Sequence, residues 1–160
     1  MRSASASRTS ALPDCEVTAT DTSEAALEAA RANARRLGLD GRVRFLAGTL
    51  PPAEGFELIL ANLPYVAEPD WSTLQPEVSE WEPREALLAG TDGLDAIRAL
   101  LSECGRAFAR YAGESSAALA LEVGEGQAEA VRGLLRESGF AAIETRFDLA
   151  GIERVVLGER

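Results

Sequence analysis

Apolar and polar positions alternate along the chain with two periods, and together they predict strands separated by helices. Short runs rich in apolar and β-branched residues predict strands at residues 15–20, 43–47, 56–61, 117–123, 142–147 and 152–157. Apolar residues three or four positions apart predict helices at residues 23–37, 92–111 and 128–138, each followed by a glycine stop at Gly38, Gly113 or Gly139. The run 56–61 is apolar enough to be buried on both faces, as parallel strands are.

Residues 62–90 interrupt this alternation. The segment holds four prolines and both tryptophans, Trp71 and Trp81. Segments of that length between elements are usually functional or disordered, and the tryptophans favour an ordered cover over an active site. The last two predicted strands are joined by only four residues, 148–151, which predicts an antiparallel pair.

This order of elements predicts an α/β fold: a doubly wound sheet that ends in an antiparallel hairpin. Residues 1–13 are rich in Ser, Ala and Arg and contain no acidic residue before Asp14, so we expect a disordered tail. Residues 14–160 then form one domain. Ligands of such sheets bind beyond the carboxyl ends of the strands, so candidate site residues follow each strand.

Composition excludes several types of catalytic and binding site. The 160 residues carry a formal net charge of −10, with no histidine and with arginine as the only basic residue. The lack of histidine excludes Ser-His-Asp and Cys-His catalysis and His-ligated metal sites. The acidic balance argues against nucleic-acid binding through phosphate contacts. Cys15 and Cys104 have no metal-type spacing and are interpreted as reduced, buried residues of a cytoplasmic protein. No apolar run approaches the roughly 18 residues of a membrane span.

Asp21 follows the first predicted strand. A carboxylate at that place typically accepts hydrogen bonds from ribose hydroxyls. The alternative interpretation is that Asp21 caps the next helix. Both can hold only if Thr22 or Ser23 caps the helix instead.

Asn62-Leu63-Pro64-Tyr65 follows the third predicted strand. Pro64 restricts Leu63 to extended conformations, which directs the Asn62 side-chain oxygen and the Leu63 carbonyl toward the same space. Two fixed acceptors suit a planar NH₂ group, and holding such a weak nucleophile in place is plausible preorganised catalysis. Tyr65 would add an apolar wall and an aromatic face for a sulfonium cation. A plain turn after a buried strand is the alternative.

Several segments match one known family: Ala19-Thr20-Asp21, Leu37-Gly38-Leu39, residues 43–48, Asn62, Pro64-Tyr65-Val66, Pro76-Glu77-Val78, Glu82-Pro83-Arg84, residues 90–95, residues 121–124, Gly126-Gln127, Gly139-Phe140 and residues 148–151. Over roughly residues 14–158, the chain resembles the C-terminal part of the catalytic domain of the HemK/PrmC family. These enzymes are S-adenosylmethionine-dependent methyltransferases that modify the side-chain amide of a glutamine in peptide chain release factors.

The resemblance implies a Rossmann-like class I methyltransferase sheet, S-adenosylmethionine as cofactor and a release factor as partner. It implies that Asp21 holds the ribose and that Thr49 and Leu50 lie beside the adenine. Asn62 and the Leu63 carbonyl would bind the glutamine amide, next to Pro64 and Tyr65.

Three features depart from the family pattern. Leu63 stands where the family has a second proline, and Thr49 stands where it usually has an acidic residue. The chain also has no glycine before Gly38, so the family's glycine-rich cofactor loop and its first strand, central in the sheet, are not matched. We therefore expect a partial domain from a truncated or misread frame, in which the strands ending at Thr20 and Ala61 lack a partner.

Two alternatives follow. The absent glycine loop would suit a catalytically dead fragment or binding remnant of the family. Leu63 in second place is also found in rRNA adenine N-methyltransferases, although those proteins are basic and lack the Glu82-Pro83 and Asp92-Gly93-Leu94 pattern.

Overall fold

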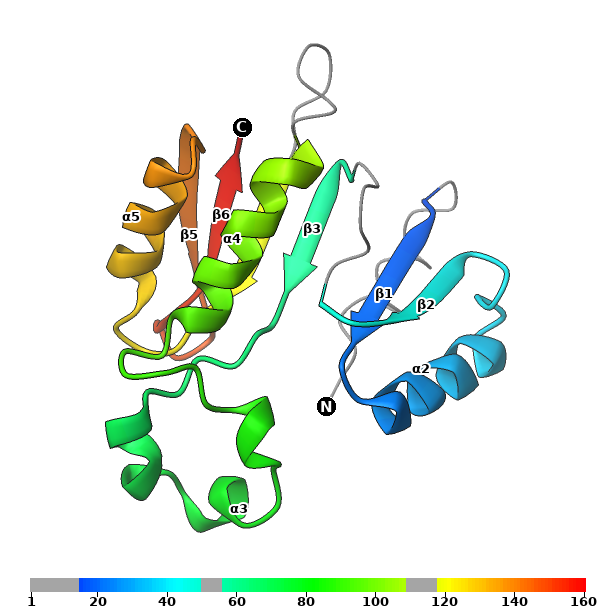
Figure 1. Ribbon diagram of the computed structural model, residues 1–160, viewed down its shortest axis with the longest axis horizontal. Coiled ribbons are helices and arrows are strands. Elements are labelled where there is room, and N and C mark those ends of the chain that lie inside the picture. Colours follow the sequence, from blue (N-terminus) through cyan, green and yellow to red (C-terminus); the bar gives the residue numbers. More distant parts are fainter. Residues whose placement is uncertain (1–14, 50–55, 109–117) are drawn as a thin grey trace. The chain divides into compact units, whose positions relative to one another are not determined.

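The chain forms two compact units, residues 1–54 and 55–160, each built around its own sheet (Figure 1). The computed structural model describes residues 15–49, 56–108 and 118–160, with the side chains of residues 105–108 left out. The predicted tail therefore lies outside the described residues.

The first unit is a strand–helix–strand arrangement. Strands β1 (Val17–Asp21) and β2 (Val43–Ala47) pair in parallel, with Val17 opposite Val43 and Asp21 opposite Ala47. Helix α2 (Glu24–Arg36) joins them. Its apolar side packs through Ala34 against Leu39 and Val43. The apolar residues of the predicted helix have different surroundings: Leu27 and Ala34 are buried, whereas Leu37 is 54% exposed because it follows the last helical turn.

The second unit holds a mixed four-stranded sheet. Its strands lie in the order β3 (Leu58–Ala61), β4 (Ala118–Glu122), β6 (Glu153–Glu159) and β5 (Ala142–Phe147). β3 and β4 are parallel, and the other two pairs are antiparallel. Asp148 closes the β5–β6 connection, because its Oδ1 accepts the N–H groups of Ala150 and Ile152 at 2.8 and 3.0 Å. The predicted C-terminal hairpin is confirmed.

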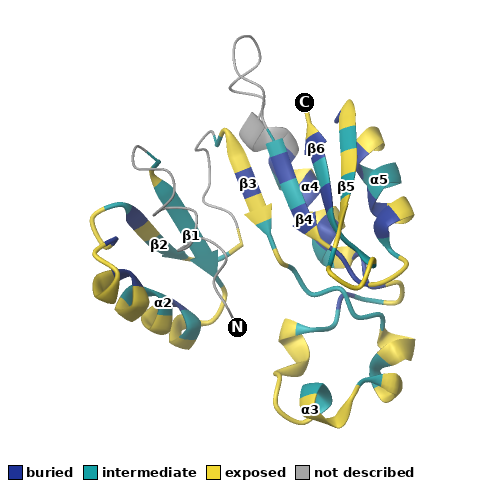
Figure 2. Ribbon diagram, turned by 180° about the vertical axis from the view of Figure 1, so that it is seen from behind, coloured by how far each residue is buried: buried dark blue, intermediate teal, exposed yellow. Residues whose placement is uncertain are grey.

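Helices α4 (Asp95–Phe108) and α5 (Ala128–Glu137) cover one face of this sheet (Figures 1 and 2). The core between helices and sheet is apolar, and its most deeply buried members include Ile97, Leu119, Leu121, Val131, Leu135 and Val156. α4 begins three residues later than predicted, because Gly90 and Gly93 adopt φ values of 78° and 74° that no helix contains.

The prediction that residues 56–61 form a strand buried on both faces is wrong. β3 is shorter and lies at an edge of its sheet. Ile59 is buried, whereas Leu58 and Leu60 on the opposite face are 38% and 39% exposed. Within the described residues the helices of this unit cover only one face, so alternate side chains of β3 have different surroundings.

Residues 67–87, which we call the excursion, leave the sheet between β3 and α4 (Figure 1). They contain the short helices η1 (Glu68–Thr73), α3 (Pro76–Ser79) and η2 (Arg84–Ala86). Hydrogen bonds of 2.9 Å from Val66 N–H to Leu87 and from Ala89 N–H to Val66 close the base of the excursion. It is thus a folded loop, as the two tryptophans predicted.

Two further expectations concern the cysteines and the membrane. Both cysteines are free thiols; Cys104 is buried, but Cys15 is only half-buried, so the prediction of two buried cysteines is half right. Burial raises the pKa of Cys104 to about 11. None of the helices in the described ranges is long and apolar enough to cross a membrane.

Candidate functional site

Asp21 and Thr49 lie together at the carboxyl end of the first unit's two strands. Asp21 is the last residue of β1, and its backbone carbonyl accepts the N–H of Gly48 at 3.0 Å. The Thr20 hydroxyl donates to the Thr49 carbonyl at 2.6 Å. These bonds bring Asp21 and Thr49 to one end of the sheet. Leu50, the third residue expected at the cofactor, lies outside the described residues.

The structure decides between the two interpretations of Asp21 as far as the helix cap is concerned. Ser23 is the N-cap of α2, and its hydroxyl accepts the N–H of Ala26 at 3.3 Å. Asp21 instead accepts the Ser23 N–H on Oδ1 at 2.8 Å, an Asx turn that orders the cap. The carboxylate is therefore held at the strand end through Oδ1, and it is not the N-cap of the helix.

Asn62, Leu63, Pro64 and Tyr65 lie directly after β3 in the second unit. Ala61, the last residue of β3, is paired with Leu121 of β4, which fixes the start of this segment. Asn62 is exposed, so its carboxamide is open to a ligand, whereas the next three residues are half-buried. Val66 pairs with Leu88 immediately after the segment. The four residues thus bridge two fixed points of the fold.

A side chain that sequence reasoning did not assign to the site lies against this segment. Gln127, at the start of α5, donates from Nε2 to the Tyr65 carbonyl at 2.9 Å. Its Oε1 accepts the N–H of Gly124, also at 2.9 Å. The two residues are 62 positions apart, so no local pattern could have revealed the contact.

Asp92 and Arg98 form an ion pair beside the same region. The Arg98 guanidinium donates to both carboxylate oxygens of Asp92, at 2.9 and 2.5 Å, and to Asp95 at 3.0 Å. Its hydrogen bonds lower the pKa of Asp92 to about 2 and raise the pKa of Arg98. Asp92 also accepts the Leu94 N–H, and this pair therefore fixes the turn that leads into α4.

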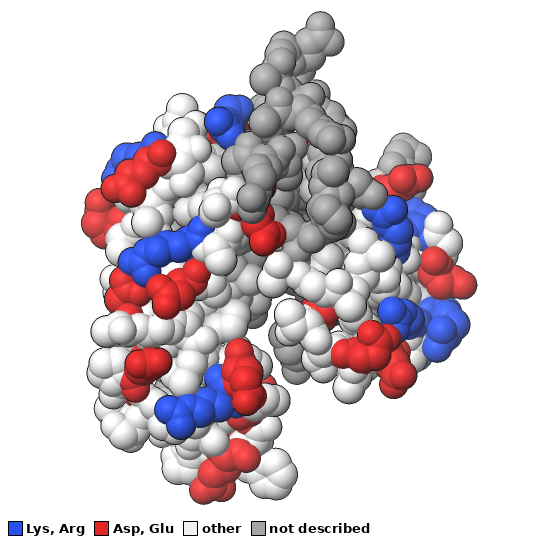
Figure 3. Space-filling model, in the orientation of Figure 1, with Lys and Arg blue, Asp and Glu red and all other residues white. Residues whose placement is uncertain are grey.

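The excursion carries six carboxylates and a single basic residue, Arg84 (Figure 3). The Arg84 guanidinium lies 4.9 Å from the centre of the Trp71 ring. Trp81, in contrast, is 82% exposed. Of the two predicted cover tryptophans, Trp71 is half-buried and contacts Arg84, whereas Trp81 is almost fully exposed.

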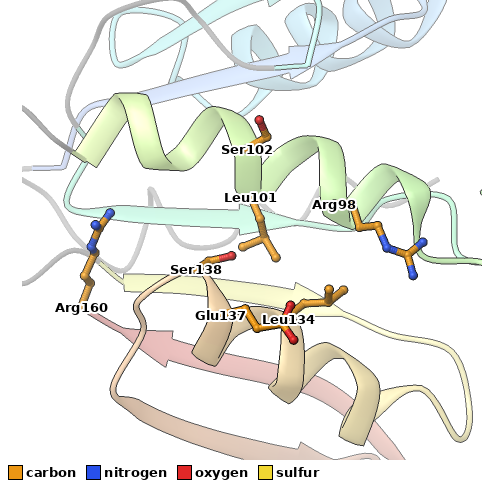
Figure 4. A pocket seen from close by; sticks show the side chains of 7 residues that line it. All are labelled: Arg98, Leu101, Ser102, Leu134, Glu137, Ser138 and Arg160. Atoms are coloured by element: carbon orange, nitrogen blue, oxygen red, sulfur yellow. The ribbon is translucent and has the colours of Figure 1, made fainter.

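A pocket of about 410 Å³ lies elsewhere, between α4 and α5 (Figure 4). Its walls are Arg98, Leu101, Ser102, Leu134, Glu137, Ser138 and Arg160. None of the predicted site residues lines it. Within the described ranges no group of three or more Cys, Asp or Glu side chains could hold a metal ion.

The predicted site residues thus fall into two groups, one in each unit. Asp21 and Thr49 belong to the first unit and Asn62 to Tyr65 to the second. What each group offers chemically is clear: a half-buried carboxylate in one, and a side-chain oxygen followed by a backbone carbonyl in the other.

Comparison with known proteins identifies relatives of this chain. It is 42% identical over 151 residues to the release factor glutamine methyltransferase of Gloeobacter violaceus, and 45% identical over 147 residues to that of Bordetella pertussis. These alignments cover 92% and 89% of this chain. Over about nine-tenths of its own length, the chain is similar to release factor glutamine methyltransferases. It spans about half the length of these relatives, 51% and 52%. No family model matches the chain.

Solved structures agree with the fold of this chain. A methyltransferase from Pyrococcus furiosus matches 96% of the chain, and 67% of its own length, with a TM-score of 0.65 at 17% identity. The N-terminal domain of human METTL16, solved in complex with SAH, matches 94% of the chain and 54% of its own length, with a TM-score of 0.55 at 9% identity. The expected Rossmann-like class I methyltransferase fold is confirmed.

Proposed function

We propose that this chain takes part in the transfer of a methyl group from S-adenosylmethionine to the side-chain amide nitrogen of a glutamine in a peptide chain release factor. The names of its relatives support the reaction class and the substrate. The observation that carries the proposal within this chain is the exposed Asn62 on a segment fixed at both ends.

In this proposal the substrate amide lies against Asn62. The Asn62 Oδ1 and the Leu63 carbonyl each accept one hydrogen of the glutamine NH₂ group, which fixes the plane of a nitrogen whose lone pair is delocalised. As that nitrogen bonds to the methyl carbon it becomes positive, and both oxygens stabilise the developing charge. The nitrogen then gives up one proton to water. Tyr65 forms an apolar wall beside it.

Asp21 and Thr49 are the residues we assign to the cofactor. S-adenosylmethionine supplies the methyl group on a sulfonium, whose carbon–sulfur bond breaks as the carbon–nitrogen bond forms. The ribose hydroxyls suit the Asp21 carboxylate, since the helix cap occupies Ser23 rather than the aspartate. Thr49 lies at the same strand end and would flank the adenine, together with Leu50. None of Asp21, Thr49 and Leu50 is assigned to the methionine part of the cofactor. The glycine-rich loop that the resemblance implies for that part is not matched, because the chain has no glycine before Gly38.

Replacement of Asn62 tests the proposal. We expect Asn62→Ala to lower the rate of methyl transfer to a purified release factor by about 100-fold or more, as loss of one preorganised hydrogen-bond partner does in other enzymes. The matched control is Asn33→Ala, because Asn33 is the only other asparagine of the chain and lies exposed on α2.

The assay uses a release factor and ribosomal RNA as parallel substrates. Equal transfer by wild type and Asn62→Ala would refute the assigned role of Asn62. Transfer to the RNA alone would replace the proposed substrate by the rRNA alternative. A wild-type chain inactive on both would favour the inactive remnant.

A further inference from the structure

The Gln127 side chain joins three separate segments of the second unit. Its Oε1 accepts the Gly124 N–H at 2.9 Å, just after β4. Its Nε2 donates to the Tyr65 carbonyl at 2.9 Å and to the Asp92 carbonyl at 3.4 Å. The backbone of Gln127 itself is fixed at the start of α5, where its carbonyl accepts the Val131 N–H. One carboxamide therefore ties the ends of two strands to the turn before α4.

Two glycines make room for these contacts. A Cβ atom on Gly93 would lie 2.3 Å from the Tyr65 carbonyl oxygen and 2.6 Å from the Gln127 Nε2. A Cβ atom on Gly124 would lie 2.8 Å from the Gln127 Oε1 and 3.1 Å from the Tyr65 ring. The backbone therefore approaches Gln127 from both sides as closely as only glycine permits.

The bonding pattern requires an amide. Gly124 offers a donor and Tyr65 an acceptor, so the side chain between them must accept on one atom and donate on the other. A glutamate of the same size could accept from Gly124, but its ionised carboxylate would face the Tyr65 carbonyl with no hydrogen to donate. An apolar residue would leave both backbone groups unsatisfied.

The Tyr65 carbonyl is the far end of the segment that begins at Asn62. β3 holds the near end through the pairing of Ala61 with Leu121. Loss of the Gln127 bond would leave the near end fixed and the Tyr65 carbonyl without its side-chain donor, so that this peptide group is held only through the Val66 N–H, which donates to Leu87 at 2.9 Å. Both Asn62 and the Leu63 carbonyl lie between these two points, so their direction depends on both.

We propose that Gln127 is a positioning residue that sets the geometry of the Asn62–Tyr65 segment by hydrogen bonding the Tyr65 carbonyl. The effect of Gln127 on methyl transfer rests on the proposed function. The effect of Gln127 on the position of the segment does not, so experiments can refute either claim without the other.

The chain provides its own internal comparison, because Gln75 is the only other glutamine and is exposed. In the labelled wild-type chain, NMR should show slower solvent exchange of the side-chain amide protons of Gln127 than of Gln75. Gln127→Glu should then move the carbonyl-carbon signal of Tyr65 and the backbone signals of Asn62, while Gln75→Glu leaves them in place. A variant that is only less stable would keep these signals in place in its folded fraction.

The kinetic part uses the same variants. Gln127→Glu should lower kcat for methyl transfer to the release factor by at least about tenfold, with a far smaller change in KM for S-adenosylmethionine. Gln75→Glu should behave as wild type.

Unmoved Tyr65 and Asn62 signals, or equal exchange of the two glutamine side chains, would overturn the proposal. Moved signals with an unchanged kcat would support the positioning of the segment by Gln127 and refute its effect on methyl transfer. If Gln127→Glu does not fold, the exchange comparison in the wild-type chain decides. If the wild-type chain transfers no methyl group, the proposed function fails for this chain, and the NMR signals alone decide whether Gln127 positions the segment.

Discussion

Single residues at the ends of strands carry most of the functional argument. The sequence alone proposes Asp21 and Asn62 as candidate site residues, because the residue after a parallel strand lies at the ligand-binding edge. It also foresaw that Ser23 could cap α2 in place of Asp21, and the structure has that arrangement. The role of Gln127 could not be foreseen, because its partner Tyr65 is distant in the chain and only the packed fold brings them together.

Gly93 provides a test of the close packing beside Tyr65. Gly93 and Gly126 have similar φ values, 74° and 80°, but a Cβ atom would clash only at Gly93. Gly126→Ala should lower the free energy of unfolding by about 1–2 kcal/mol through backbone strain alone. Gly93→Ala should cost about 1–3 kcal/mol more, because the Tyr65 carbonyl must move. Urea unfolding of both variants measures the difference, and equal losses would contradict the packing described.

The Asp92–Arg98 pair predicts a pH dependence of stability. The pKa of Asp92 is about 2 in the folded chain, below its ordinary value of 3.8. The pair therefore stabilises the fold above about pH 4, and this contribution is lost as the pH falls through about 2. Arg98→Gln should return the Asp92 pKa toward 3.8 and flatten the fall in stability over this range.

Carboxyl-carbon NMR titration gives the pKa of Asp92, and urea midpoints across the same pH range give the stability. Arg136→Gln serves as the control, because Arg136 contacts Glu129 and not Asp92. An Asp92 pKa that stays about 2 in Arg98→Gln would show that the guanidinium is not its cause.

At the scale of elements, hydrophobic periodicity predicted all the described strands and the three longer helices, with shifts at their ends. The ends shifted where special backbone or side-chain bonds intervene. β1 starts at Val17 rather than residue 15, opposite Val43, the first residue of β2, and the Cys15 carbonyl accepts a hydrogen bond from the Arg42 side chain at 2.7 Å. The prediction that residues 56–61 are buried on both faces was wrong. The apolar character of Leu58 and Leu60 does not show whether another element covers their face of the sheet.

The stability of the second unit depends on the apolar face of the sheet that the helices cover. Leu119, in the middle of β4, is fully buried, whereas Leu149 in the β5–β6 connection is fully exposed. We expect Leu119→Ala to lower the free energy of unfolding by about 2–5 kcal/mol. Leu149→Ala should change it by less than about 0.5 kcal/mol. Similar effects of the two substitutions in urea unfolding would contradict this packing.

At the scale of the whole molecule, the strands are divided between two sheets. β1 and β3 each lie at an edge of their sheet, and in the described ranges neither has a second partner strand. The resemblance led us to expect that these two strands would lack a partner. The chain also matches only about half the length of its relatives.

The most direct measurement is mass spectrometry of a purified release factor after incubation with this chain and methyl-labelled S-adenosylmethionine. We predict one labelled methyl group on the side chain of a glutamine, formed about 100-fold or more slowly when Asn62→Ala replaces the wild type. Label on any other residue type, or a release factor that stays unlabelled beside a full-length relative that labels it, would contradict the proposed activity of this chain.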